Sequence, residues 1–222
     1  TRMTGDWRQR TEWLLGQGVH VINMSATTNS SNGNYGADDR WLDHIAINHS
    51  VHFVKSAGNR GMSDRLVTSP GMAYNAITVG AIDDGNTAAE GNDVLANYSS
   101  TTENGTTGRT NKPDLVAPGS NIATSAGADS GTSFAAPHVT GVIAQLLQQR
   151  PALRTLQDGL KAIITASVNH SVLSYGTNNA AFDTSGAGLI DSRSSSSWTI
   201  ANWRYVTSNF AANSANGSEK TY

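Results

Sequence analysis

The segment GTSFAAPHVTG, residues 131–141, carries the most specific pattern in the chain. Gly131 and Thr132 precede Ser133, and Pro137 follows four positions later. Residues 132–149 are expected to form a helix, so Ser133 lies in its first turn, near unpaired N–H groups and the positive end of the helix dipole. Because Pro137 has no N–H to donate, a carbonyl near Ser133 is expected to lack its usual helical partner.

Two interpretations of Ser133 follow. A lone Gly-Thr-Ser triplet is most often a helix cap, since serine and threonine are common at that position. A serine hydroxyl beside a base, in a positive environment, can instead act as a nucleophile. Gly131 would then let the backbone approach a substrate closely. The triplet alone favours the cap, so the decision rests on the longer segment around it.

The composition limits the possible functions. The chain has 222 residues, of which 37% are apolar and 14% charged, with a formal net charge of −2. This balance disfavours nucleic acid as a partner. Apolar runs stay well below the roughly 18 residues of a membrane span, and the first residues lack the apolar core of a signal peptide. With no cysteine in the sequence, disulfide scaffolds and thiol chemistry are excluded.

Strands and helices alternate along the chain. Strands are expected at 19–25, 51–58 and 75–83, a short extended segment at 114–119, and helices at 7–17, 38–50, 132–149 and 153–168. Near-continuous apolar strands of this kind indicate an α/β fold whose parallel sheet is covered on both faces. Ligands bind at the carboxyl ends of such strands, which here means Ser25 onward and residues 56–61. From about residue 191 the composition is typical of a linker or outer appendage, although Trp198, Trp203 and Tyr205 indicate that part of it docks.

Several segments together resemble one family. GTSFAAPHVTG is similar to the segment around the nucleophilic serine of the subtilisin-like serine proteases, the subtilases. Further segments resemble that family in the same order and spacing: VINMSAT (21–27), SAGNRG (56–61), SPGMAYNAITVGAID (69–83), KPDLVAPGSNI (112–122) and GAGLIDS (186–192). The resemblance implies a three-layer α/β/α fold and a serine endopeptidase. It divides the chain into a C-terminal portion of the catalytic domain, 1–192, and a Ser/Asn-rich extension, 193–222.

The resemblance also assigns roles to residues. Ser133 becomes the nucleophile, and Asn59 the side chain that, with the Ser133 N–H, stabilises the oxyanion of the tetrahedral intermediate. Alone, Asn59 would more often be a turn residue between Gly58 and Gly61. The residues implied to line the substrate cleft are Ser25, Ala26, Thr27, Ser56, Ala57 and Gly58. His138 has no catalytic role in the family and is expected to be packed or hydrogen-bonded, because positions i and i+5 of a helix face different ways.

The Asp and His motifs of the subtilase triad are missing from the expected places. The family carries D-[ST]-G after its first strand and H-G-T-x-V-x-G at a helix start, and none of the six histidines here is followed by Gly-Thr. Three explanations stand: a truncated or cleaved catalytic domain, one part of a split protease, or a non-catalytic relative. The first is favoured because both the serine and oxyanion motifs are present. His44 or His49 as a replacement base is disfavoured, since both fall on a predicted outer helix.

Further expectations follow from the resemblance. No cofactor is required, but calcium is possible as a structural ion, with the backbone carbonyls of Gly71, Ala73 and Ala76 as weak candidates. The partners are a polypeptide substrate and either a complementary N-terminal segment or a second copy, because a sheet lacking central strands exposes an edge. A secreted, surface or periplasmic location is expected. The alternatives are an inactive fragment or a binding or structural module; a lipase-type hydrolase is disfavoured because G-x-S-x-G is lacking.

Overall fold

The computed structural model describes residues 6–26, 33–61, 66–87, 93–102, 111–169 and 184–201. The helices are α1 (Trp7–Gly16), α2 (Ala37–His49), α4 (Thr132–Gln149), the short η2 (Pro151–Thr155), α5 (Gln157–Ala166) and α7 (Ser192–Ala201). The strands are β1 (Val21–Met24), β2 (His52–Ser56), β3 (Ala76–Asp83), β4 (Val94–Leu95), β5 (Leu115–Pro118), β6 (Ile122–Thr124) and β7 (Gly127–Asp129). No helix in these ranges is long and apolar enough to cross a bilayer.

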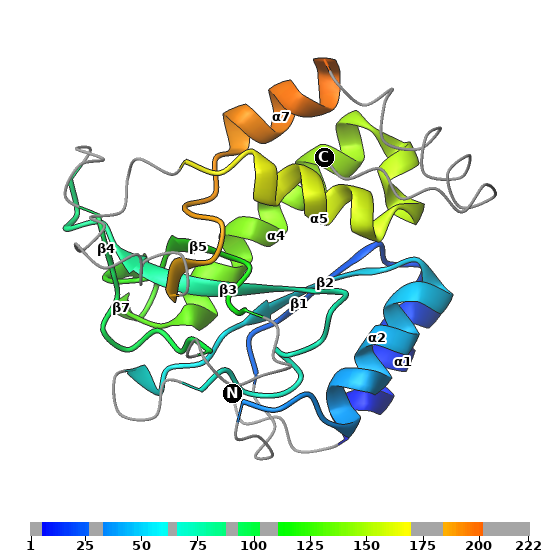
Figure 1. Ribbon diagram of the computed structural model, residues 1–222, viewed down its shortest axis with the longest axis horizontal. Helices are drawn as coiled ribbons and strands as arrows, with labels where there is room; N and C mark the ends of the chain where they lie inside the picture. Colours follow the sequence, from blue (N-terminus) through cyan, green and yellow to red (C-terminus); the bar gives the residue numbers. More distant parts are fainter. Residues whose placement is uncertain are drawn as a thin grey trace, which may run out of the picture.

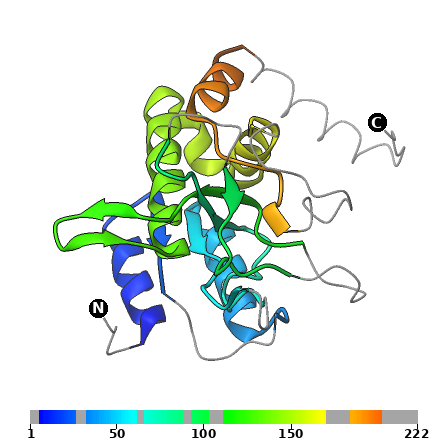
Figure 2. The ribbon, with the colours of Figure 1, turned by 90° about the vertical axis from the view of Figure 1, so that its left-hand side faces the viewer.

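A mostly parallel sheet forms the middle layer. β1 pairs with β2, β2 with β3 and β3 with β5, all in parallel, while the short β4 runs antiparallel to the end of β3. Helices α1 and α2 lie on one face, and α4 and α5 cover the other (Figure 1). This is the predicted three-layer α/β/α arrangement. β6 and β7 form a separate hairpin that stands out from the body (Figure 2).

Alternating side chains of the strands fill two cores. Phe53 and Ile22 point toward α2, where they meet Leu42, Ile45 and Ala46. Val54 and its neighbours on the opposite face pack against α4 and α5; the buried apolar side chains there include Val79, Ala81, Leu115, Val139, Ile143, Leu146 and Leu160. Burying a side chain of this size contributes about 1.5–3 kcal/mol relative to leaving it exposed. Both faces of β2 and β3 are therefore buried, as the near-continuous apolar runs of the sequence predicted.

The C-terminal helix α7 differs from the expected linker. Although its sequence is SRSSSSWTIA, residues 192–201 are helical, and Ser195 is fully buried. The hydroxyls of Ser195 and Ser167 are 2.6 Å apart, and Ser196 donates to the side chain of Gln149. The expectation that part of this region docks is confirmed for this helix. Trp203 and Tyr205 lie outside the described residues, as does most of the extension predicted over 193–222.

His52 links strand β2 to the short helix η2. It begins β2, is 2% exposed, and its Nε2 lies 3.0 Å from the carbonyl oxygen of Leu153 in η2. Burial lowers the pKa of His52 below its usual value, although the hydrogen bond to Leu153 acts in the opposite direction. On acidification the unfolded chain therefore binds a proton at this residue before the folded chain does.

The pH dependence of stability follows from this order of protonation. The contribution of neutral His52 is complete above about pH 6.5 and is lost as the pH falls through the lowered folded pKa, at no more than about 1.4 kcal/mol per pH unit. Urea unfolding between pH 7.5 and pH 5 is expected to show a steeper loss for the wild type than for His52→Gln, which keeps an amide donor but does not titrate. Parallel curves for the two proteins would contradict this role.

Candidate active site

The first turn of α4 lies against the loop that follows β2. The helix begins at Thr132, and Gly131 precedes it with φ 159°. A Cβ on Gly131 would lie 2.9 Å from Nδ2 of Asn59, closer than a side chain tolerates. Only glycine allows the helix start and Asn59 to approach this closely. That Gly131 also lets the backbone approach a substrate stays a prediction.

Thr132 holds Asn59 in one orientation. Its backbone N–H donates to Oδ1 of Asn59 at 2.9 Å, and its hydroxyl donates to the same oxygen at 2.8 Å. The hydroxyl of Thr132 also accepts from the backbone N–H of Gly58 at 3.1 Å. Because two donors meet at one amide atom, that atom is the oxygen, and Nδ2 is left on the other side of the side chain. The sequence assigned no function to Thr132, and its place between Gly131 and Ser133 was the only signal.

Ser133 sits in the next position with two connections to the end of β1. Its hydroxyl donates to the carbonyl oxygen of Ser25 over 3.4 Å, and the hydroxyl of Ser25 donates to the carbonyl of Ser133 at 3.0 Å. That carbonyl is available because Pro137, four residues later, has no N–H. The carbonyl of Ser133 therefore lacks its helical donor, as predicted, and accepts a hydrogen bond from the hydroxyl of Ser25 instead.

The backbone N–H of Ser133 is the remaining donor near Nδ2 of Asn59. Within the residues described, it has no hydrogen-bond acceptor, as is usual in the first turn of a helix. Ser133 is half-buried and Asn59 is exposed, so a ligand can reach both. Two N–H donors, one from an amide side chain and one from a helix start, thus lie close to each other beside Gly131.

The residues expected to line the cleft follow two adjacent strands. Ser25 and Ala26 come after β1 and are half-buried; Ser56 ends β2, and Ala57 and Gly58 follow it, all three buried. The N–H of Ala57 donates to Val79 in β3, and the carbonyl of Gly58 accepts from Ser100. Thr27 lies outside the described residues. That these residues line a substrate cleft stays a prediction.

A buried lysine adjoins Ser56, one of the residues expected to line the cleft. Lys55 in β2 is 0% exposed, and its ammonium donates to the carbonyl and the hydroxyl of Ser56. Burial lowers the pKa of Lys55 to about 7, while the charge of Asp39 opposes that change. The alternation of side chains along β2 turns Lys55 toward α2, away from Ser133.

No histidine in the described ranges forms a hydrogen bond with Ser133. His44 and His49 are exposed on α2, as expected, and His44 meets Asn48. His138 is also exposed, so the expectation that it would be packed or hydrogen-bonded is wrong. The side of α4 that carries Pro137, His138 and Gly141 has no cover among the described residues, and sequence periodicity could not reveal which side that would be.

The letters D-S-G do occur once before the serine, at residues 129–131. Asp129 ends the hairpin strand β7 rather than a strand of the main sheet, and it is exposed. Its Oδ1 accepts from the N–H of Ser130 at 2.8 Å. This carboxylate caps its own turn, and within the described residues it contacts no histidine.

The comparisons with known proteins agree with this geometry. A family model described as the subtilase family matches residues 2–193. The chain belongs to the subtilase family of serine proteases. Serine protease AprX of Bacillus subtilis is 37% identical over 117 residues, covering 44% of this chain and 26% of AprX. Subtilisin BL of Lederbergia lenta is 29% identical over 188 residues, covering 82% of this chain and 58% of its own.

A third relative and the solved structures extend the comparison. A subtilisin-like serine protease of Rhodotorula mucilaginosa is 31% identical over 172 residues, covering 72% of this chain and 45% of that protein. The chain thus spans well under two thirds of these curated relatives. The patellamide maturation protease PatA has the same fold with a TM-score of 0.64 and 22% identity, covering 86% of this chain and 67% of PatA. The PatG macrocyclase, solved with a peptide, gives a TM-score of 0.62 at 17% identity, covering 87% of this chain and 55% of that one.

The hydrogen bonds that join Thr132 to Asn59 and Gly58, here called the Thr132 bridge, can be tested by their effect on stability. Thr132→Val keeps the shape of the side chain but leaves the N–H of Gly58 without its acceptor. It also removes one of the two donors to Oδ1 of Asn59. The variant is expected to lose about 1–3 kcal/mol of unfolding free energy in urea, while Thr132→Ser, which keeps the hydroxyl, loses less. A valine variant as stable as the wild type would show that the bridge does not hold this region together.

Proposed function

We propose that this chain contributes the nucleophile and the oxyanion hole of a serine endopeptidase. Ser133 is the nucleophile, and Nδ2 of Asn59 and the N–H of Ser133 stabilise the developing negative charge. The observation that carries the proposal is the Thr132 bridge, because it engages Oδ1 of Asn59 and leaves only the donor end of that amide for a substrate. Membership of a serine protease family supports the same reading.

The proposed reaction is peptide-bond hydrolysis in two stages. The Ser133 hydroxyl gives its proton to a base, and its oxygen bonds to the scissile carbonyl carbon, whose oxygen becomes an oxyanion held by the two N–H donors. The C–N bond then breaks, the amine leaves with a proton, and an acyl-enzyme remains on Ser133. Water attacks this ester with the help of the same base, releases the acid and restores the hydroxyl.

We propose that the general base and its orienting carboxylate come from residues other than those described. Support comes from the absence of the H-G-T-x-V-x-G sequence in the 222 residues and from the lack of any described histidine bonded to Ser133. The base would approach from the uncovered side of the Ser133 hydroxyl, either on a complementary segment or on a partner chain. A module that keeps the peptide groove without catalysis is the second candidate.

The remaining proposals concern substrate and location. Ser25, Ala26, Ser56, Ala57 and Gly58, at the ends of β1 and β2 beside Ser133, are proposed to line the cleft that binds the polypeptide. Thr27 is included on the sequence resemblance alone. Export to the cell surface or beyond is proposed from the similarity to subtilisin-like proteases, and cell fractionation would test it.

Labelling with a fluorophosphonate, measured by intact mass, tests the division of the site. The chain alone and Ser133→Ala are both expected to stay unlabelled, because an unactivated serine reacts slowly. Co-expression with a subtilase segment that carries the D-[ST]-G and H-G-T-x-V-x-G motifs is expected to give labelling that requires Ser133. Rapid Ser133-dependent labelling of the chain alone would show that a base already reaches the serine.

The oxyanion role of Asn59 has its own test in the labelling-competent protein. Removing this type of donor in subtilisin costs about 10²–10³ in kcat, and Asn59→Ala is expected to lose a similar factor with little change in KM. Asn59→Asp keeps an acceptor for Thr132 but loses the donor, so it should lose turnover while keeping more stability than Asn59→Ala. Either variant within tenfold of wild-type turnover would exclude Asn59 as the donor.

A further inference from the structure

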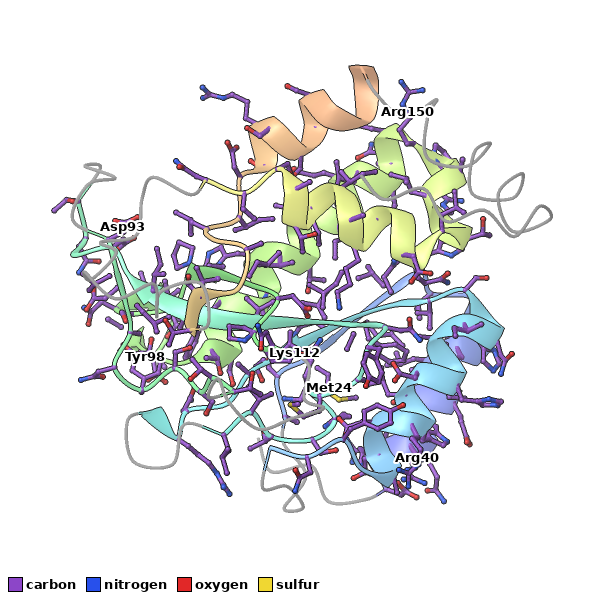
Figure 3. All side chains as sticks on the ribbon, viewed as in Figure 1. Met24, Arg40, Asp93, Tyr98, Lys112 and Arg150 are labelled. Atoms are coloured by element: carbon purple, nitrogen blue, oxygen red, sulfur yellow. The ribbon has the colours of Figure 1, made fainter. Side chains whose placement is uncertain are left out.

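The carbonyl groups of the loop before β3 converge on two lysine side chains. Nζ of Lys161, in α5, lies 2.8 Å from the carbonyl oxygen of Tyr74 and 3.0 Å from that of Ala76. Nζ of Lys112 lies 3.1 Å from the same oxygen of Ala76. Figure 3 shows Lys112 in the interior of the molecule, beside β3. Oxygen atoms that converge in this way repel one another unless a positive charge lies between them.

Asp114 completes the cluster. Its Oδ2 accepts from Lys112 at 2.7 Å and its Oδ1 from Lys161 at 2.9 Å, while the N–H of Thr78 donates to Oδ2 at 2.7 Å. The Lys112 side chain is 1% exposed, that of Asp114 10% and that of Lys161 22%. Two ammonium groups and one carboxylate leave a net charge of +1 among backbone carbonyls, which is the charge of a monovalent cation. All three donors of Lys161 have an acceptor.

The opposite side of the same loop faces negative charge. Asp39 and Asp43 of α2 accept from backbone N–H groups of Met72, Tyr74 and Asn75. The peptide groups of the loop thus direct their N–H bonds toward two carboxylates and their carbonyls toward two ammonium groups. This arrangement fixes the loop from both sides.

Two of the three carbonyls named as calcium candidates, those of Gly71 and Ala76, already accept hydrogen bonds from side chains. That of Ala76 is shared by two ammonium groups, and that of Gly71 accepts from the hydroxyl of Thr78 at 2.6 Å. A calcium ion needs six to eight oxygen ligands, and two ammonium groups at the same oxygen would repel it. Within the described residues, no group of three or more acidic or histidine side chains is placed to hold a metal.

We propose that the ammonium groups of Lys161 and Lys112 act as a built-in cation for the loop at 71–76, so that this part of the protein needs no metal ion. Removing the ammonium of Lys161 leaves Lys112 and Asp114 with no net charge, so the Tyr74 and Ala76 carbonyls and one carboxylate oxygen of Asp114 should form a weak site for a cation that keeps most of its water ligands. The partial exposure of Lys161 gives such an ion a route from solvent. The inference concerns stability and does not depend on the proposed protease function.

Thermal unfolding with and without cations tests the proposal at constant ionic strength. The wild type is expected to melt within about a degree in EDTA, K⁺ or Ca²⁺, whereas Lys161→Ala melts several degrees lower in EDTA and recovers part of the loss in millimolar Ca²⁺ or K⁺. The matched control is Lys161→Ala with Asp114→Asn, which removes the carboxylate and is expected to lose the recovery. No recovery of Lys161→Ala with either cation would overturn the proposal.

Terbium luminescence locates the site, because Tyr74 adjoins it and tyrosine sensitises a nearby lanthanide. Lys161→Ala is expected to show several-fold more Tb³⁺ emission than the wild type, and the added Tyr74→Phe substitution is expected to remove that increase. If the wild type already gives the Tyr74-dependent emission, the loop binds a metal beside the lysines and the proposal is wrong. Should Lys161→Ala fail to fold, Lys161→Gln, which keeps a donor, takes its place in both measurements.

Discussion

The hydrogen bonds between Thr132 and Asn59 are the constraint on which the site depends. They join the start of α4 to the loop after β2, two segments 73 residues apart in sequence, and they set which end of the Asn59 amide is free. Gly131 permits the contact because it has no side chain. Pro137 adds the second connection, since the carbonyl that it leaves free binds Ser25 at the end of β1. Ser133, the proposed nucleophile, is therefore held at both strand ends without a substrate, as catalysis by preorganised donors would require.

The supporting loop follows a related electrostatic logic. Residues 69–76 carry little regular structure, yet their N–H groups meet Asp39 and Asp43 and their carbonyls meet Lys112 and Lys161. Ala57 and Met72 of this loop belong to one buried apolar cluster, so the loop also supports the segment after β2 that carries Asn59. Charged side chains thus satisfy backbone N–H and carbonyl groups of this loop, as neighbouring strands do in the sheet. A buried charge is tolerated here because each has several partners.

The main helices and strands, and the proximity of Asn59 to Ser133, could be predicted from the sequence. The runs at 21–24, 52–56 and 76–83 are strands, of which the second and third are buried on both faces, and 132–149 is a helix of the predicted bounds. The hairpin at 122–129 was missed because its exposed strands have no apolar pattern. The serine-rich sequence of α7 favours a linker or an outer appendage, because serine is a weak helix former, and its docking depends on the distant Ser167. The lysine contacts to Tyr74 and Ala76 were not predictable, since backbone carbonyls leave no mark in a sequence.

Amide hydrogen exchange at the start of α4 tests the central claim most directly. First-turn amides of a helix normally exchange fast, because they lack acceptors. We expect the amides of Thr132, bonded to Asn59, and of Gly58, bonded to Thr132, to exchange slowly. The adjacent amide of Ser133, the proposed oxyanion donor, is expected to exchange fast. Equal, fast exchange of Thr132 and Ser133 would contradict the bridge and with it the preformed oxyanion hole.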